Sequence, residues 1–365
     1  MQDLLSAAAG IGVGLVVLVA GGELLVRGAS ALATLLRISP LVIGLTVVSF
    51  GTSAPELAVS VQAAYAGNTD LAVGNLVGSN IANVLLILGL AALIAPLSVS
   101  SKLVRFDVPL VVGASFLLLL LGLDGAVGMW EGVLLLGLLG VYSAWTGRQG
   151  RAEYEATQVS SGEAAPTATP RRRGTLWHLA LVVLGLVLLG LGARWLVDGA
   201  VAVARLLGVQ ELVIGLTVVA IGTSLPELVT TLLATLRGER ELAVGNIVGS
   251  NLFNILGVLG LASILAPEGI PVSEAALSLD IPIMIATAVA CLPIFFTGHQ
   301  IARWEGGLFF FYYLAYMTYL VMDATEHSGT GGLALIMTAF VMPLTVVTLG
   351  VCTVRALRAR AVSSR

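Results

Sequence analysis

A repeated apolar stretch with a carboxylate inside it constrains this chain more than any other feature. Residues 41–96 read as two apolar segments joined by the polar turn Gly67–Asp70. Residues 212–267 repeat them, with about 33 of 56 positions identical. Within its first apolar segment each copy carries a glutamate directly after a proline, Glu56 in the first copy and Glu227 in the second. Because a carboxylate inside a membrane-length apolar segment is costly, the pattern predicts a functional site with internal pseudo-symmetry.

The composition requires a membrane protein. Of the 365 residues, 58% are hydrophobic and 11% are charged, which excludes a soluble globular domain. Apolar runs separated by turn residues predict an all-α polytopic fold with eleven transmembrane helices. Their expected ranges are 4–35, 40–66, 71–96, 104–123, 127–146, 175–207, 211–236, 242–266, 279–298, 303–322 and 331–354.

The repeat extends beyond the opening stretch and predicts the domain organisation. Asp107-Val-Pro matches Asp280-Ile-Pro, and Trp130-Glu-Gly matches Trp304-Glu-Gly, so each unit holds five helices. Five is odd, so the second unit is expected to enter the membrane from the opposite side, as an inverted repeat. We expect a first repeat over residues 1–147, a flexible cytoplasmic linker over 148–174 and a second repeat over 175–323. An extra transmembrane helix with a basic tail follows over 324–365.

Basic residues predict the orientation of these helices. With the N-terminus outside and the C-terminus inside, nearly all loop arginines and lysines fall on the inner side, with Arg205 as the exception. The expected inner residues are Arg37, Lys102, Arg105, Arg148, Arg151, Arg171–Arg173, Arg237, Arg240, Arg303, Arg355, Arg358, Arg360 and Arg365. The chain is therefore predicted to be a multi-pass protein of the cell inner (plasma) membrane.

Other charged groups have structural interpretations. Glu23 with Arg27, and Arg194 with Asp198, are four residues apart and are predicted to form local ion pairs on the first and sixth helices. Asp107 and Asp280 stand at helix starts, where a carboxylate is expected to cap the helix.

The polar residues of the repeat are predicted to meet at mid-membrane. Glu56 lies about 11 residues, or roughly 16 Å of helix, before the turn, and Ser79 and Asn83 lie roughly 14 to 20 Å after it. The hydrocarbon core is about 30 Å thick, so these depths coincide near its middle. Pro55 should break its helix and free a carbonyl, with that of Ser49 as a candidate.

Pairing the two halves brings together a set of oxygen ligands. The predicted site contains two carboxylates, two amides and six hydroxyl groups: Glu56, Glu227, Asn83, Asn254, Thr52, Ser53, Ser79, Thr223, Ser224 and Ser250. Oxygen ligands without sulfur or imidazole suit Ca²⁺ or Na⁺. No lysine or arginine lies within a turn or two of either glutamate, so a bound cation or protonation must balance the charge.

These motifs resemble those of the sodium/calcium exchangers of the cation/Ca²⁺ exchanger superfamily, in their prokaryotic form. Gly51-Thr-Ser-Ala-Pro-Glu56 and Gly222-Thr-Ser-Leu-Pro-Glu227 look like the two alpha-repeat signatures of that family. Gly74-Asn-Leu-Val-Gly-Ser-Asn80 and Gly245-Asn-Ile-Val-Gly-Ser-Asn251 do so as well. The resemblance covers the ten repeat helices, and the eleventh helix departs from that core.

The resemblance implies electrogenic exchange of several Na⁺ for one Ca²⁺ by alternating access. It implies that the two glutamates are shared ligands, and that the hydroxyl groups and the backbone carbonyls of Ser49 and Ala220 complete the Na⁺ sites. The family carries Asn or Asp at positions 83 and 254, and both are Asn here. Partners other than Ca²⁺, Na⁺ and the lipid bilayer are not expected. We therefore predict no cofactor, no nucleic acid and no protein partner, with a monomer sufficient for transport.

Three other functions are alternatives to a Na⁺/Ca²⁺ exchanger. A proton-coupled Ca²⁺ exchanger would use the same carboxylates, but that branch typically has Gly-Asn-x-x-x-Glu in place of Gly-Thr-Ser-x-Pro-Glu. A cation channel would need a continuous wet pore. An intramembrane enzyme is disfavoured because the three histidines lie at helix ends or in loops, away from any serine nucleophile. For an exchanger, rocking of long, loosely held first and sixth helices is the expected alternation.

Overall fold

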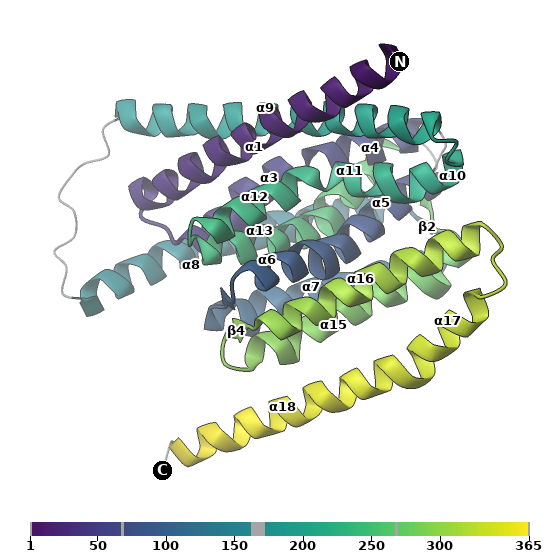
Figure 1. Ribbon diagram of the computed structural model, residues 1–365. Coiled ribbons are helices and arrows are strands. Elements are labelled where there is room, and N and C mark those ends of the chain that lie inside the picture. Colours follow the sequence, from purple (N-terminus) through teal and green to yellow (C-terminus); the bar gives the residue numbers. More distant parts are fainter. Residues whose placement is uncertain (1, 67–68, 162–171, 267–268, 364–365) are drawn as a thin grey trace.

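The computed structural model describes residues 2–66, 69–161, 172–266 and 269–363, and they form a helical bundle (Figure 1). In the first half of the chain, with η denoting π-helical segments, the elements are α1 (Gln2–Leu36), α2 (Pro40–Ile43), η1 (Gly44–Val48), α3 (Ser49–Thr52), α4 (Ala54–Tyr65), α5 (Thr69–Ala82), η2 (Asn83–Leu88), α6 (Gly89–Ile94), β1 (Leu97–Ser98), η3 (Leu103–Asp107), α7 (Val108–Gly122), β2 (Ala126–Val127) and α8 (Met129–Ser161).

The second half repeats this order and then adds a further helix. Its elements are α9 (Arg172–Leu206), α10 (Glu211–Ile214), η4 (Gly215–Val219), α11 (Ala220–Thr223), α12 (Leu225–Leu236), α13 (Arg240–Phe253), η5 (Asn254–Leu259), α14 (Gly260–Leu265), β3 (Ile270–Pro271), η6 (Ala276–Asp280), α15 (Ile281–Phe296), β4 (Gln300–Ile301), α16 (Arg303–Ala324), α17 (Thr330–Ile336), η7 (Met337–Val341) and α18 (Met342–Ser363).

The helices are long and apolar enough to cross a membrane many times. Among the described residues, nine helices meet the length and composition of a membrane span, and two bent helix pairs bring the number to as many as eleven. The bent pairs are Pro40–Thr52 with Ala54–Tyr65, at 43°, and Thr217–Thr223 with Leu225–Leu236, at 60°. The prediction of an all-helical polytopic protein is confirmed.

Proline accounts for both bends. The first helix pair breaks at Ser53 (φ −80°, ψ 8°), and Pro55 then lies in the first turn of α4. Ser224 and Pro226 repeat this arrangement at the start of α12. Proline lacks an amide hydrogen and clashes with the preceding turn, yet it fits the first turn of a new helix. The predicted break at Pro55 is therefore confirmed.

Short strands tie the two halves together. β1, which follows the third span of the first half, pairs antiparallel with β4, which lies between the last two spans of the second half. β2 and β3 form the reciprocal pair. Each half therefore contributes one strand of each type, and the two pairings are related by the same pseudo-symmetry as the sequence repeat.

The two long helices α1 and α9 pack tightly along one side of the bundle (Figure 1). A Cβ atom at Gly21 would lie 2.6 Å from the Leu189 nitrogen, and one at Gly192 would lie 2.5 Å from the Leu18 nitrogen. Residues later in α1 contact residues earlier in α9, so the two helices are antiparallel. Small residues allow the two backbones to approach closely, and such close packing drives helix association in membranes. The expectation that these helices are loosely held is wrong for their contact with each other.

The ion pairs predicted on the long helices are present, and one of them extends to a third element. Glu23 pairs with Arg27 at 2.6 Å and also binds Arg237 at the end of α12. Arg194 and Asp198 are 3.8 Å apart and exposed.

Two local predictions need correction. Asp107 and Asp280 form no side-chain cap on α7 and α15; they accept hydrogen bonds from Tyr142 and Tyr316, each at 3.0 Å. Both tyrosines belong to the helices packed alongside, so tertiary contact prevails over local capping.

The predicted linker 148–174 is helical over 148–161, because its Ala, Glu, Gln and Arg residues favour helix and extend α8. Residues 162–171 lie outside the described part.

The added helix lies on the opposite side of the bundle from α1 and α9 (Figure 1). It comprises α17, η7 and α18, and most of its described side chains are exposed in the isolated chain. Tyr312 on α16 approaches Thr345 at 2.6 Å between their hydroxyl oxygens. It packs against α15 and α16.

Candidate functional site

The proline breaks place each glutamate in the first turn of a new helix. Glu56 is the third residue of α4, and Glu227 is the third residue of α12. Helix N-termini carry partial positive charge and unpaired amide hydrogens, which stabilise a carboxylate. Both side chains are completely buried. The sequence thus builds two buried anionic groups on matching helix ends.

The Glu56 carboxylate lies where the two halves meet. Its Oε1 accepts a hydrogen bond from Ser79 of its own half at 3.1 Å and from Ser224 of the other half at 3.1 Å. The two hydroxyl oxygens are themselves 3.0 Å apart. These three predicted site residues form one contiguous cluster.

The Glu227 carboxylate makes a similar contact across the halves. Its Oε1 accepts a hydrogen bond from Ser53 at 3.0 Å. Ser53 and Ser224, the two residues at the helix breaks, therefore each bind the glutamate of the opposite half. The contact between halves places the two breaks side by side.

The two predicted asparagines begin π-helical segments. Asn83 is the first residue of η2 and Asn254 the first of η5, and both are fully buried. Asn254 donates to Ser79 at 3.1 Å, which joins it to the Glu56 cluster. Single π-helical turns inside α-helices occur frequently at functional sites. The irregular backbone thus coincides with the predicted ligands.

Several buried oxygen atoms of these residues have no hydrogen-bond partner among the described residues. They are Glu56 Oε2, Glu227 Oε2, Asn83 Oδ1, Asn254 Oδ1 and Ser250 Oγ. Buried polar atoms are nearly always paired, so a cluster of unpaired oxygens requires an explanation. All five belong to predicted site residues, and a hard cation would satisfy them.

The two threonines are held by asparagines from the opposite half. Thr52 donates to Asn246 at 3.3 Å, and Thr223 donates to Asn75 at 3.2 Å. Asn75 also binds the backbone carbonyl of Glu56 at 3.3 Å. With their hydrogens directed to amide oxygens, the threonine oxygens keep lone pairs for other contacts.

The resemblance implies the backbone carbonyls of Ser49 and Ala220 as ligands, and the two helix breaks differ in their hydrogen bonding near these carbonyls. The Ser49 carbonyl accepts the Ser53 amide at 3.0 Å and faces the Thr52 hydroxyl at 3.4 Å. The break therefore does not free it, contrary to the expectation from sequence, because the chain keeps an α-type bond across Ser53. In the second half, the Ser224 amide donates to Ile221 at 3.1 Å, and Ala220 is exposed.

Sequence reasoning missed four asparagines that surround the site. Asn75, Asn80, Asn246 and Asn251 all contact predicted site residues. The doubled Gly-Asn-x-x-Gly-Ser-Asn motif contained the signal, because all four belong to it. Polar residues repeated in an apolar helix could have been assigned to the same network.

The arrangement suits cation binding. It combines two formal negative charges with amide and hydroxyl oxygens in a buried space, and the described ion pairs of arginine involve Glu23 and Asp198 instead of these glutamates. Carboxylate and neutral oxygens without thiolate or imidazole are hard ligands, which prefer Na⁺ and Ca²⁺ over transition metals.

Comparison with known proteins gives matches over most of the chain. Residues 6–147 and 177–322 match the sodium/calcium exchanger protein family. The putative antiporter CaxA of Alkalimonas amylolytica is 43% identical over 283 residues, which cover 77% of this chain and 86% of that protein. The sodium/calcium exchanger MaX1 of Methanosarcina acetivorans is 34% identical over 338 residues, covering 84% of this chain and 96% of that protein.

A solved structure matches the fold as well. The sodium-calcium exchanger NCX_Mj, soaked with 10 mM Na⁺ and zero Ca²⁺, superposes with a TM-score of 0.74 at 31% sequence identity. The match covers 85% of this chain and 97% of that chain.

Proposed function

The chain belongs to the sodium/calcium exchanger protein family, and from this we propose that it exchanges Na⁺ for Ca²⁺ by alternating access at the Glu56–Glu227 site. As a member of that family it is a multi-pass membrane transporter of the cation/Ca²⁺ antiporter type, and not an enzyme.

The observation that carries the proposal is the cluster of buried, unpaired oxygens around two carboxylates. Glu56 Oε2 and Glu227 Oε2 have no hydrogen-bond partner among the described residues, and both side chains are fully buried. An uncompensated charge at this depth costs roughly 3 kcal/mol or more. A bound cation removes that cost, so the site is built to hold positive charge.

Charge balance supports competition between the two ions. Two carboxylates neutralise one Ca²⁺ or two Na⁺, so either load gives a nearly neutral site. The empty site carries two buried negative charges and should reorient reluctantly. A transporter of this kind crosses between its two states mainly when loaded, and this couples the two ion fluxes.

A difference between the two halves supports alternating access. In α13, a Cβ atom at Gly245 would lie 2.7 Å from the Leu41 carbonyl oxygen, and one at Gly249 would lie 2.6 Å from Ser49 Oγ. Their counterparts in α5, Gly74 and Gly78, meet no described atom within 4 Å. Thus α13 is packed closely against α2, η1 and α3, whereas α5 is not packed closely against η4. We take the close contact of α13 with η1 as a closed entrance to the site, and the looser region between α5 and η4 as its open counterpart.

The proposed topology assigns these entrances to the two sides of the membrane. We propose two inverted five-helix repeats, residues 1–147 and 175–323, with an eleventh span, the N-terminus outside and the C-terminus inside. The antiparallel packing of α1 and α9, which are equivalent in the repeat, supports the inversion. Because η1 follows Arg37, which is expected inside, the closed entrance faces the cytoplasm and the open one faces outward.

The hydroxyl groups favour Na⁺ over H⁺ as the coupling ion. Ser53, Ser79 and Ser224 are buried and contact the carboxylates at 3.0 to 3.1 Å. Oxygens grouped at this spacing offer neutral ligands to Na⁺, whereas a proton needs only the carboxylate. We further propose that a monomer is sufficient, that the protein resides in the plasma membrane and that Ser49, Ala220, Thr52 and Thr223 supply further Na⁺ ligands.

Flux measurements on the purified protein in liposomes test the proposal. Ca²⁺ uptake should follow an imposed Na⁺ gradient, saturate with Ca²⁺ and show a fixed Na⁺ to Ca²⁺ ratio. Uptake that follows a pH gradient and ignores Na⁺ would assign the protein to proton coupling. Flux that does not require a counter-ion would indicate a channel.

A further inference from the structure

Two asparagines at equivalent positions, Asn80 in α5 and Asn251 in α13, lie behind the proposed ion ligands. Both are buried, and each directs its amide nitrogen at the other's backbone carbonyl. The distance from Asn80 Nδ2 to Asn251 O is 3.2 Å, and that from Asn251 Nδ2 to Asn80 O is 3.5 Å. A backbone carbonyl can only accept a hydrogen bond, so these contacts determine which branch of each amide is the NH₂ group.

The remaining branch of each amide must then be an acceptor. Asn80 Oδ1 accepts from Asn254 Nδ2 at 3.0 Å. Asn251 Oδ1 accepts from Asn83 Nδ2 at 3.0 Å. Reversing Asn83 or Asn254 would bring two amide oxygens face to face. The two main-chain carbonyls therefore fix the orientation of the Asn80 and Asn251 amides, and these in turn fix the Asn254 and Asn83 amides.

The consequence appears at the ion site. Once the NH₂ groups of Asn83 and Asn254 are bound, their Oδ1 atoms are left over, and these are among the buried oxygens without a described partner. An amide in the reverse orientation would present positive hydrogens to a cation. The fixed orientation presents the oxygen.

We propose that Asn80 and Asn251 are positioning residues that set the amide polarity of Asn254 and Asn83, so that both present oxygen to the transported cation. The inference deepens the proposed function and rests on it. Each positioning residue acts across the interface, because Asn80 orients a residue of the second half and Asn251 orients one of the first.

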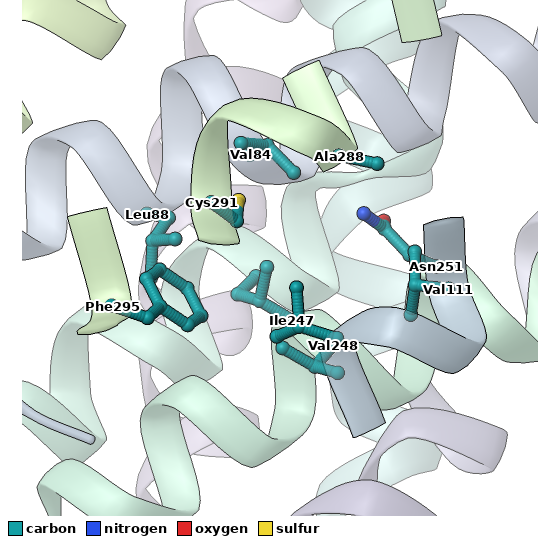
Figure 2. Close-up of a pocket in the computed structure, with 10 residues that line it drawn as sticks. Val84, Leu88, Val111, Ile247, Val248, Asn251, Ala288, Cys291 and Phe295 are labelled. Carbon is teal, nitrogen blue, oxygen red and sulfur yellow. The ribbon is translucent and has the colours of Figure 1, made fainter. Parts of the chain in front are cut away.

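The surroundings of Asn251 make its contacts hard to replace. It borders a small apolar cavity opposite Leu88 and Phe295 (Figure 2). Among the ten residues that line this cavity, Asn251 carries the amide, and Cys291 directs its thiol to the Thr287 carbonyl at 3.4 Å. An ordered water needs two to four polar partners, and this wall does not supply them. Water is thus a poor substitute for a lost partner here.

The two positioning residues should differ in importance. Asn83 Nδ2 has one acceptor among the described residues, Asn251 Oδ1, whereas Asn254 Nδ2 also donates to Ser79 at 3.1 Å. Removal of Asn251 leaves Asn83 free to turn. Removal of Asn80 leaves Asn254 held by one bond.

The first measurement is the half-saturating Ca²⁺ concentration of uptake by the full-length protein in liposomes. Asn251→Ala should raise it about tenfold, as for a buried polar group that loses its partner, and Asn80→Ala should raise it less. Maximal uptake should change less than the half-saturating concentration. Ser115→Ala is the matched control, because Ser115 is buried but donates only to Val111 of its own helix. Its half-saturating concentration should equal that of the wild type.

A second background separates positioning from a structural role. In Asn83→Asp both branches are oxygen, so no neighbour is needed to choose the atom presented. Adding Asn251→Ala to Asn83→Asp should leave the half-saturating Ca²⁺ concentration unchanged or lower it. The reason is that Asn251→Ala removes the Asn251 Oδ1 oxygen, which would face the carboxylate introduced at position 83. An equal rise in both backgrounds, or no rise in either, would overturn the proposal.

A binding measurement distinguishes failure of this proposal from failure of the proposed function. Ca²⁺-dependent thermal stabilisation of the detergent-purified protein gives the same comparison without transport. Wild-type uptake driven by H⁺ would refute Na⁺ coupling while leaving both readouts of the asparagines in place. If Asn251→Ala does not fold, Asn80→Ala in the wild-type and Asn254→Asp backgrounds provides the same test, and equal effects in the two backgrounds refute it.

Discussion

Glu56 and Glu227 occupy equivalent positions, but their carboxylates are not bound equally. Glu56 Oε1 accepts from two serines, Ser79 and Ser224, whereas Glu227 Oε1 accepts from Ser53. The hydroxyl of Ser250, the counterpart of Ser79, has no hydrogen-bond partner among the described residues. The sequence repeat is symmetric, whereas its hydrogen bonding is not. The proposed alternating access would produce such a difference between the halves.

At the same scale, replacing either glutamate by glutamine should abolish exchange. The amide keeps the shape of the side chain but removes one of the two negative charges that would balance the bound cation. We expect the free energy of cation binding to weaken by several kcal/mol and uptake to fall on the order of 100-fold. Initial Ca²⁺ uptake of Glu56→Gln and Glu227→Gln under a Na⁺ gradient measures the effect. Asp198→Asn, which breaks an exposed ion pair on α9, is the control and should transport normally. Wild-type rates in either glutamine variant would exclude the site.

The individual residues of the candidate site were predictable to different degrees. Glu56, Glu227 and the serines stand out because charge and hydroxyl groups are rare in apolar helices, and the repeat doubles the signal. The crossed pairs, such as Ser53 with Glu227, depend on how two segments far apart in sequence pack together. The expectation that the break frees the Ser49 carbonyl was wrong, because this carbonyl still accepts the Ser53 amide across the break.

At the scale of elements, the glycines of α5 should matter most when the open entrance closes. By the pseudo-symmetry, Gly78 would then approach η4 as Gly249 now approaches η1 and α3. Gly78→Leu should fold and bind Ca²⁺, since a Cβ atom there meets no described atom within 4 Å, but exchange should fall at least about tenfold because closure is obstructed.

The control for this change is Gly113→Leu in α7, where a Cβ atom also meets no described atom within 4 Å. Because Gly113 takes no part in either entrance, its exchange should be retained. The readouts are Ca²⁺-dependent thermal stabilisation for binding and liposome uptake for transport. Normal uptake in Gly78→Leu would show that α5 and η4 never come into close contact.

The packing of α1 on α9 makes a second prediction about elements. Gly21→Val would place side-chain atoms within the backbone of α9, because a Cβ atom there already lies 2.6 Å from the Leu189 nitrogen. Overpacking of this kind costs about 1–3 kcal/mol. The melting temperature of the purified protein should fall by several degrees. Gly12→Val, on the same helix but without a described atom within 4 Å, should melt like the wild type.

Element boundaries show where sequence reasoning succeeds and fails. Length, apolarity and proline predicted the helices and both bends, because each of these is a local property. The π-helical turns at Asn83 and Asn254 have no such local signal, since their extra residue is accommodated by packing against the other half. The helical continuation of α8 to Ser161 was missed because polar composition was taken as evidence against helix.

At the scale of the whole molecule, both halves build the candidate site, and neither half contains it alone. Ser224 and Asn254 of the second half reach the Glu56 cluster of the first, and Ser53 reaches Glu227 in return. Strand pairs β1–β4 and β2–β3 fasten the halves at their ends. Tight fastening at the ends and glycine-lined contacts near the middle are consistent with movement of α1 and α9 as a pair across the remaining helices.

The inverted topology makes the last prediction. Ala66 directly follows α4, and Arg240, which begins α13, lies shortly after α12, the counterpart of α4. Both residues are exposed. If the second half is inverted, these ends lie on opposite sides of the membrane, with Ala66 outside and Arg240 inside. In a background with Cys352→Ser and the buried Cys291 retained, Ala66→Cys should react with a membrane-impermeant maleimide added to intact cells. Arg240→Cys should react only after the cells are opened. Labelling of both cysteines from the same side would refute the inverted repeat. Labelling with the sides exchanged would preserve the inversion but reverse the orientation, and the open entrance would then face the cytoplasm.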